Sequence, residues 1–161
     1  MASGEIELLL RILEEAYSKR SWHGTNLRGS LRGVSAEEAS WRPGKGRHNI
    51  WELMLHAAYW KYTVRRRLLG GGRGSFPLDG SDWFVRPAGG DEERWKRELK
   101  LLGGEHRQLV AAVSSIRSAD LGVFAGRSKN DNATVIYGVA AHDLYHAGQI
   151  QLIKRLLAGR A

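Results

Sequence analysis

The sequence predicts an all-α protein, built as a four-helix bundle with long crossover connections. Apolar residues recur every three to four positions in four separate segments, which is the spacing of one face of a helix. No segment alternates apolar and polar residues between hairpin turns, and no repeat of fixed period appears. Since 161 residues are typical of one domain, we expect a single domain over residues 1–161.

The first segment carries an apolar stripe of helical spacing, formed by Ile6, Leu9, Leu10, Leu13 and Tyr17. The stripe resumes at Leu27, so we place Trp22 and His23 on this first helix. Ser35, with Glu38 three residues later, has the pattern of a capping box. That pattern predicts a short helical turn before the chain breaks in a Pro-Gly-rich stretch.

The second helix should begin at Asn49, whose side chain can accept from the first helical amides, with Glu52 at the matching box position. Its expected buried stripe is Leu53, His56, Trp60, Val64 and Leu68. A run of three glycines ends the helix. Residues 70–90 then form a long crossover, in which Trp83 and Phe84 should anchor the chain to the bundle.

Two further helices complete the bundle. The third begins with acidic residues from Asp91, which suit the positive end of the helix dipole. Its stripe is Trp95, Leu99, Leu102, His106, Leu109, Val113 and Ile116. After an irregular stretch over residues 118–130, the fourth helix ends before Gly159. One face of this helix carries Val135, Val139, His142, His146, Gln149, Ile153 and Leu156.

Composition restricts the possible functions. The chain has no cysteine, which excludes disulfides and thiolate ligands, so a metal would be held by His, Asp or Glu. The acidic start does not resemble a secretory signal and no apolar stretch has transmembrane length, so we expect a cytoplasmic protein outside the membrane. The net charge of +8 could attract nucleic acid. Because the basic residues are scattered apart from Arg65-Arg66-Arg67, we do not expect nucleic-acid binding.

The most informative residues are three histidines on the buried stripes. His142 and His146 are four residues apart, so both imidazoles project from one side of their helix, and His56 lies midway along another helix. Three core histidines would need six hydrogen-bond partners, whereas a shared metal satisfies three of the nitrogens at once. We therefore predict a divalent metal held by His56, His142 and His146. Nitrogen ligands favour zinc or nickel, and a fourth position left to water or substrate is typical of catalytic sites.

Several neighbouring residues have more than one interpretation. Gln149 lies three residues after His146, so it should share the metal-bearing face, where Trp22 and His23 could line an open pocket. Asp143 stands where an HExxH protease carries its general base, which leaves a metal-dependent hydrolase open. We favour a surface pairing of Asp143 with a basic neighbour. His106 is expected to be a core or interface histidine.

Residues 51–56, WELMLH, together with residues 142–150, HDLYHAGQI, resemble the DinB/YfiT-like superfamily of metal-dependent proteins. The stretch Trp22-His23-Gly24 and residues 34–50 are also similar to the first helix of that family and to the connection that follows it. The resemblance extends along the whole chain, and the order and separation of these motifs carry it.

The resemblance implies a four-helix bundle, a homodimer, and a metal held by His56, His142 and His146. It also implies a transferase or isomerase in which a low-molecular-weight thiol, such as bacillithiol or mycothiol, is activated at the metal and reacts with a small-molecule substrate. A thiol that binds a divalent cation loses its proton readily, so the chain need supply no cysteine. A hydrolase and a non-catalytic metal-binding protein remain alternatives.

Overall fold

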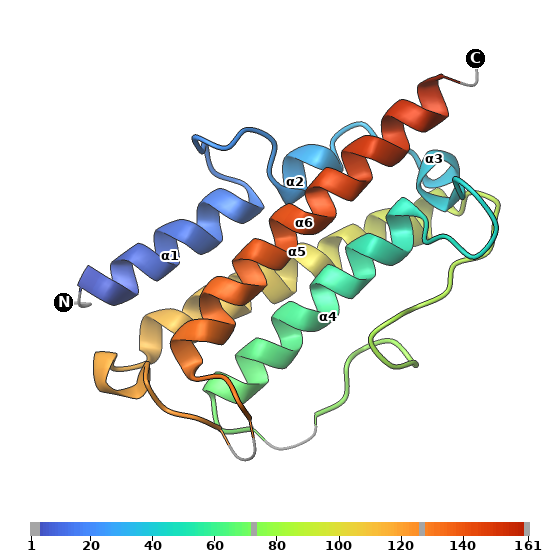
Figure 1. Ribbon diagram of the computed structural model, residues 1–161. Coiled ribbons are helices and arrows are strands. Elements are labelled where there is room, and N and C mark those ends of the chain that lie inside the picture. Colours follow the sequence, from blue (N-terminus) through green and yellow to red (C-terminus); the bar gives the residue numbers. More distant parts are fainter. Residues whose placement is uncertain (1–3, 72–73, 126–127, 160–161) are drawn as a thin grey trace.

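The computed structural model describes residues 4–71, 74–125 and 128–159, and over these residues it is helical without a strand. Four long helices form the bundle: α1 (Gly4–Tyr17), α4 (Ile50–Leu68), α5 (Glu92–Ser115) and α6 (Asn132–Ala158). The shorter elements are α2 (Leu27–Ser30), α3 (Ala36–Ser40) and the 3₁₀ turn η1 (Ser118–Asp120). The all-α fold class predicted from the apolar periodicity is confirmed (Figure 1).

The four long helices form a ring in which each one packs against two others. Helix α6 packs against α1 and α4, and α5 packs against the same two helices. Helix α1 therefore lies opposite α4, and α5 opposite α6. The chain crosses the bundle between α1 and α4, through α2 and α3, and again between α5 and α6. The irregular stretch expected over residues 118–130 lies in the second of these crossings. The long crossover expected over residues 70–90 instead joins α4 to α5, which are neighbours, so this crossover loop is long but does not cross the bundle. The ring has an α4–α6 side and an α1–α5 side (Figure 1).

The helix boundaries follow from their caps. The Asn49 side chain accepts from the Glu52 amide at the start of α4, as its sequence position predicted. Ser35 and Glu38 form the reciprocal capping box that was predicted for the short helix α3. Gly70, at φ +64°, provides the left-handed backbone conformation just after α4. These local signals set the starts of α3 and α4 and the end of α4.

The expectation that the first helix continues past Trp22 and His23 is wrong. Helix α1 ends at Tyr17, and residues 18–26 form a loop with Gly24 at φ +99°. Asn26 holds the loop shut, because its side chain donates to the Lys19 carbonyl and caps α2. Polar residues fill this stretch, so no apolar stripe exists there to pack a helix against the bundle.

The crossover loop between α4 and α5 is anchored by two residues that follow Trp83. The Phe84 side chain is buried in the core, as predicted. Arg86 is buried as well: its guanidinium donates to Glu98 of α5 at 2.8 Å, and its backbone amide donates to Glu52 of α4 at 2.9 Å. These contacts hold the preceding residues of the loop against α4.

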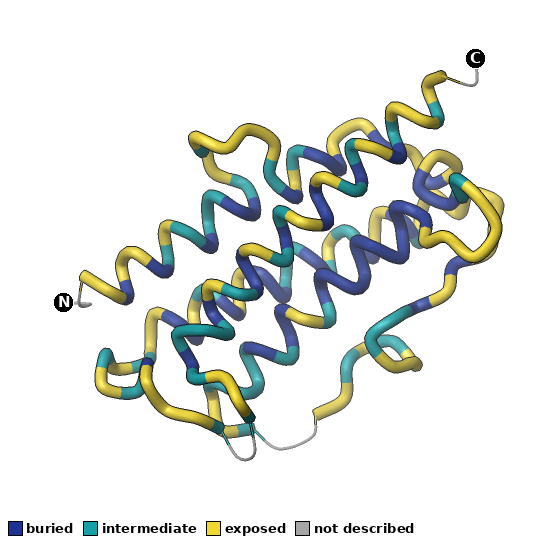
Figure 2. Tube along the Cα trace, in the orientation of Figure 1, coloured by how far each residue is buried: buried dark blue, intermediate teal, exposed yellow. Residues whose placement is uncertain are grey.

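Helix α6 is buried on more than one side, because α1, α2 and α4 all pack against it. Figure 2 shows dark blue residues along much of its length, interrupted by an exposed outer face. Among the described residues, no helix combines the length and apolar character needed to cross a membrane.

Candidate metal centre

The three histidines predicted from their stripes come together on the α4–α6 side of the bundle. One potential ligand atom from each of His56, His142 and His146 lies within 4.8 Å of the other two. His56 projects from the middle of α4, and the other two project from successive turns of α6. The ring centroids of His142 and His146 are 4.3 Å apart, and each lies about 5 Å from that of His56. Such a cluster matches the size of a mononuclear site.

His56 is oriented by the crossover loop. Its Nδ1 lies 2.7 Å from the backbone carbonyl of Asp82, and because a carbonyl only accepts, Nδ1 carries the proton and donates. This tautomer leaves Nε2 with a free lone pair. The indole of Trp83 stacks on the same imidazole, with centroids 3.9 Å apart and planes inclined by 8°. The loop therefore fixes both the tautomer and the plane of the His56 imidazole.

His146 is oriented from within its own helix. Its Nδ1 donates to the Gln149 side-chain oxygen at 2.6 Å, which again leaves Nε2 unprotonated. Gln149 thus lies on the same face of α6 as His146, as its helical spacing predicted, and acts on that imidazole directly. The Nε2 atoms of His142 and His146 are 2.9 Å apart. Two nitrogens bound to one tetrahedral ion lie about 3.3 Å apart, so a small movement admits an ion.

His142 supplies a second sign that the cluster suits a metal. Its Nδ1 is buried and has no hydrogen-bond partner among the described residues, and its Nε2 faces the Nε2 atom of His146. Buried polar atoms normally have partners, and a single ring nitrogen shared between two imidazoles does not satisfy both. A cation that accepts the lone pairs of the facing nitrogens would remove this conflict.

All three imidazoles are held in the neutral form that can ligate a metal. Burial, together with the neighbouring His146 and His56, lowers the pKa of His142 to about 3. Burial lowers the pKa of His146 to about 4, although the bond to Gln149 opposes the shift. The pKa of His56 is lowered by burial too, against the raising effect of the Asp82 carbonyl. Protons therefore compete weakly for these nitrogens at neutral pH.

Aromatic side chains border the cluster. Trp83 lies between two imidazoles, because its other face stacks on His48 at a centroid distance of 3.6 Å. Trp60 lies edge-on to His142, and Tyr145 lies edge-on to His146. Both of these rings are exposed, Trp60 by 36% and Tyr145 by 65%. An apolar rim thus surrounds the nitrogens on the solvent side.

Asp143 does not lie on the helix surface, so the expected surface pairing is wrong. Its carboxylate is completely buried and accepts a short hydrogen bond from Lys61 of α4, whose ammonium is also completely buried. Burial raises the pKa of Asp143 to about 6, and Lys61 opposes this shift. The aspartate therefore joins α6 to α4 behind His142 and does not face the three ring nitrogens.

Two residues expected near the cluster do not approach it. Trp22 is 100% exposed, and His23 is exposed in the same loop, where its ring nitrogen contacts Ser21. Both belong to the connection between α1 and α2, away from the α4–α6 side. His106 is buried on α5, as predicted, and stacks on Tyr17 at 3.8 Å. It belongs to neither the cluster nor its rim.

Sequence reasoning missed the residues that come from the crossover and from the interior. The Asp82 carbonyl, the stacking role of Trp83 and the pairing of Lys61 were not foreseen. The Asp82 carbonyl and Trp83 contact His56 from 26 and 27 residues further along the chain, and no periodic sequence pattern connects such distant positions. A lysine at a position flanked by stripe residues of α4 was the one available signal for the buried ion pair.

Comparison with known families gave one match. The model of the DinB superfamily matches residues 20–150, which is most of the chain and includes all three clustered histidines. Comparison with curated proteins and with solved structures gave no match.

Proposed function

The chain belongs to the DinB superfamily, and from this membership and the histidine cluster we propose a metal-dependent transferase that uses a low-molecular-weight thiol. The observation that supports the proposal most is the convergence of His56, His142 and His146 within 4.8 Å. Three neutral imidazoles, with no further His, Asp or Glu of the described residues in the group, leave a coordination position for an exogenous group. The metal would be divalent, with zinc or nickel as the best-matched ions for nitrogen ligands.

When bound, the ion would lower the pKa of a coordinating thiol, so that the thiolate is available at neutral pH. The residues of the chain then have separate tasks. The three histidines bind the ion through Nε2, while Gln149 and the Asp82 carbonyl hold the protons on Nδ1 of His146 and His56. The lack of cysteine in the chain fits a reaction whose nucleophile arrives from solution.

The rim favours a small organic substrate. The exposed rings of Trp60 and Tyr145 lie in edge-to-face contact with His142 and His146, where they can contact the carbon skeleton of a thiol or an electrophile. We place this reaction in the cytoplasm, where low-molecular-weight thiols are reduced. A metal-dependent hydrolase and a non-catalytic metal-binding protein are the other outcomes that the following experiment separates.

Cobalt-substituted protein should develop a near-ultraviolet charge-transfer band when a cellular thiol is added, because a thiolate that binds cobalt gives such a band. The band should titrate with thiol concentration, and electrophile turnover should require the thiol. The matched control is His146→Ala loaded under the same conditions, which should give neither signal. Turnover of esters or amides without thiol would identify a hydrolase. Metal binding without a band or turnover would identify a binding protein.

We propose that the chain forms a homodimer through the outer face of α6. Four large apolar side chains are exposed along this helix: Tyr137, Tyr145, Leu152 and Leu156. They are separated by eight, seven and four residues, so they share one side of the helix. Exposed apolar stripes of this kind are typical of interfaces between protein chains. Because Tyr145 also borders the histidines, the dimer would partly cover the metal centre.

The dimer should dissociate when a charge is placed in the middle of this face. Light scattering at tens of micromolar should give the mass of two chains for the unmodified protein and of one chain for Leu152→Glu, since the new carboxylate would be buried without a partner. Leu8→Glu is the matched control, because Leu8 is exposed on α1. A monomeric unmodified protein, or equal dissociation of both variants, would contradict the assignment.

A further inference from the structure

A large cavity lies on the α1–α5 side of the bundle and includes none of the three clustered histidines. Its volume is about 1250 Å³, and its lining comes from α1, α2, α5, the loop that joins α1 to α2 and the two residues after α2, with Gln151 as the contribution of α6. Ligand sites typically occupy roughly 300–1,000 Å³, so the space suffices for a small organic molecule. We refer to it as the α1–α5 cavity.

The lining of this cavity is strongly cationic. It contains six basic side chains and a single acidic one, Glu14; the basic residues are Lys19, Arg20, Arg28, Arg32, Lys100 and Arg107. In the sequence these residues are spread over 89 positions, which is why the basic residues appeared scattered. No ion pair or side-chain hydrogen bond joins any of the six to another described residue. Folding therefore brings together unpaired positive charges, which repel one another unless an anion binds between them.

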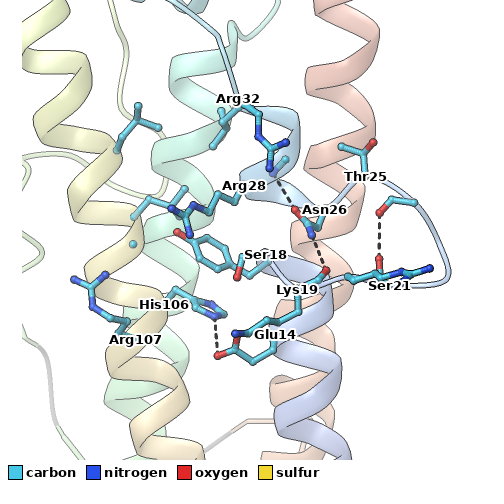
Figure 3. A pocket seen from close by; sticks show the side chains of 18 of the residues that line it. Glu14, Ser18, Lys19, Ser21, Thr25, Asn26, Arg28, Arg32, His106 and Arg107 are labelled. Carbon is cyan, nitrogen blue, oxygen red and sulfur yellow. Dashed lines mark hydrogen bonds and ion pairs between the residues drawn. The ribbon is translucent and has the colours of Figure 1, made fainter.

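A buried polar side chain lines the same cavity. His106 is 3% exposed, and neither ring nitrogen has a hydrogen-bond partner among the described residues. The Glu14 carboxylate is 3.7 Å from its Nε2, beyond hydrogen-bond distance. Figure 3 shows the ring facing that carboxylate, with Arg28 and Arg107 nearby. An imidazole buried without partners is costly unless a ligand supplies them.

The stacked rings of Tyr17 and His106, together with Leu31, Leu99 and Leu102, add an apolar part to the lining. Inorganic ions alone would not use this surface. A molecule with an organic body would cover it, and its anionic groups would reach the surrounding guanidinium groups, which bind phosphate and carboxylate oxygens in pairs.

We propose that the α1–α5 cavity is a second binding site, distinct from the metal centre, for a small organic molecule that carries at least two phosphate or carboxylate groups. Arg28 and Arg107 bind the anionic groups, and His106 hydrogen bonds to the ligand from inside the cavity. The site goes beyond the proposed transferase activity and does not depend on it.

Calorimetric titration with ADP and with citrate tests the site and separates phosphate from carboxylate ligands. At least one probe should bind, and Arg28→Gln combined with Arg107→Gln should weaken that binding at least tenfold, because two charge-assisted contacts are lost. Arg97→Gln is the matched control, since Arg97 is exposed on α5 outside the cavity. It should change the affinity less than twofold. Absence of binding by both probes, or equal weakening by Arg97→Gln, would overturn the proposal.

Two further measurements locate the bound anion. The ring ¹⁵N signals of His106 should shift during the titration, and His106→Phe, which keeps a ring against Tyr17, should bind at least tenfold more weakly while it retains its thermal stability. Binding should persist in His146→Ala, whose metal centre is impaired. Unchanged His106 signals at saturation, or binding that is lost in His146→Ala, would place the anion elsewhere and overturn the site. Displacement of the probe by a DNA duplex would overturn the site if Arg97→Gln also weakens binding as much as the double variant does. Both results together would indicate general electrostatic attraction.

Discussion

His146→Ala is expected to lower the affinity of the chain for zinc or nickel by at least an order of magnitude. The substitution removes one of three nitrogen ligands and also frees Gln149, whose oxygen otherwise fixes the His146 tautomer. The remaining pair, His56 and His142, cannot enclose an ion to the same degree. Elemental analysis should give one metal per unmodified chain, and competition with a chromogenic chelator should measure the loss.

His23→Ala is the matched control for this experiment, because His23 is exposed in the loop after α1 and contacts Ser21 instead of the cluster. Its metal affinity should equal that of the unmodified protein. Both variants should keep the far-ultraviolet helical signal, since the bundle has a large apolar core of its own. Equal stoichiometry and affinity in His146→Ala and the unmodified chain would rule out the assigned ligands. Loss of helix on chelation would indicate a structural metal.

The second large effect should come from the ion pair between Lys61 and Asp143. Lys61→Met and Asp143→Leu are each expected to lower the free energy of unfolding by about 3–5 kcal/mol, because each leaves the other group buried without its partner. The double variant should recover to within about 1 kcal/mol of the unmodified protein or exceed it. Burial already raises the pKa of Asp143 to about 6 despite Lys61, so the pair compensates its own desolvation only in part.

Urea unfolding at one fixed metal concentration measures these differences, provided that the slopes of the transitions agree. Lys96→Met provides the comparison, since Lys96 pairs with Glu93 at 3.8 Å on the exposed side of α5. That substitution should change the stability by less than about 1 kcal/mol. Additive losses in the double variant would show that the two buried groups do not stabilise each other.

The parts of the protein that the sequence could predict depend on local spacing. The cap at Asn49 and the four-residue interval between His142 and His146 are properties of one helix, so they hold whatever the helix packs against. Placing His56 with them required only that its stripe face the same core. For this reason the sequence was sufficient to predict both the helix bundle and the clustering of the three histidines.

The rest depends on contacts between distant segments. Asp143 was assigned to the surface because one stripe was taken as the whole buried face of α6, whereas three other helices pack around it. Trp83 was correctly expected to anchor the crossover, but nothing in its neighbourhood indicated that it would lie between His48 and His56. The cationic lining of the α1–α5 cavity could not be predicted from the sequence, because its basic residues are far apart along the chain.

The contact that orients His56 in the candidate metal centre affects how this protein can diverge over time. The partner of His56 is the backbone carbonyl at position 82, and every amino acid provides that oxygen. Substitutions at position 82 should therefore have little effect on the orientation of His56. Insertions and deletions between Gly74 and Arg86 should change that orientation, because they move the carbonyl relative to α4 while Arg86 stays bound to Glu98. Selection in this loop should act on its length more strongly than on the identity of residue 82.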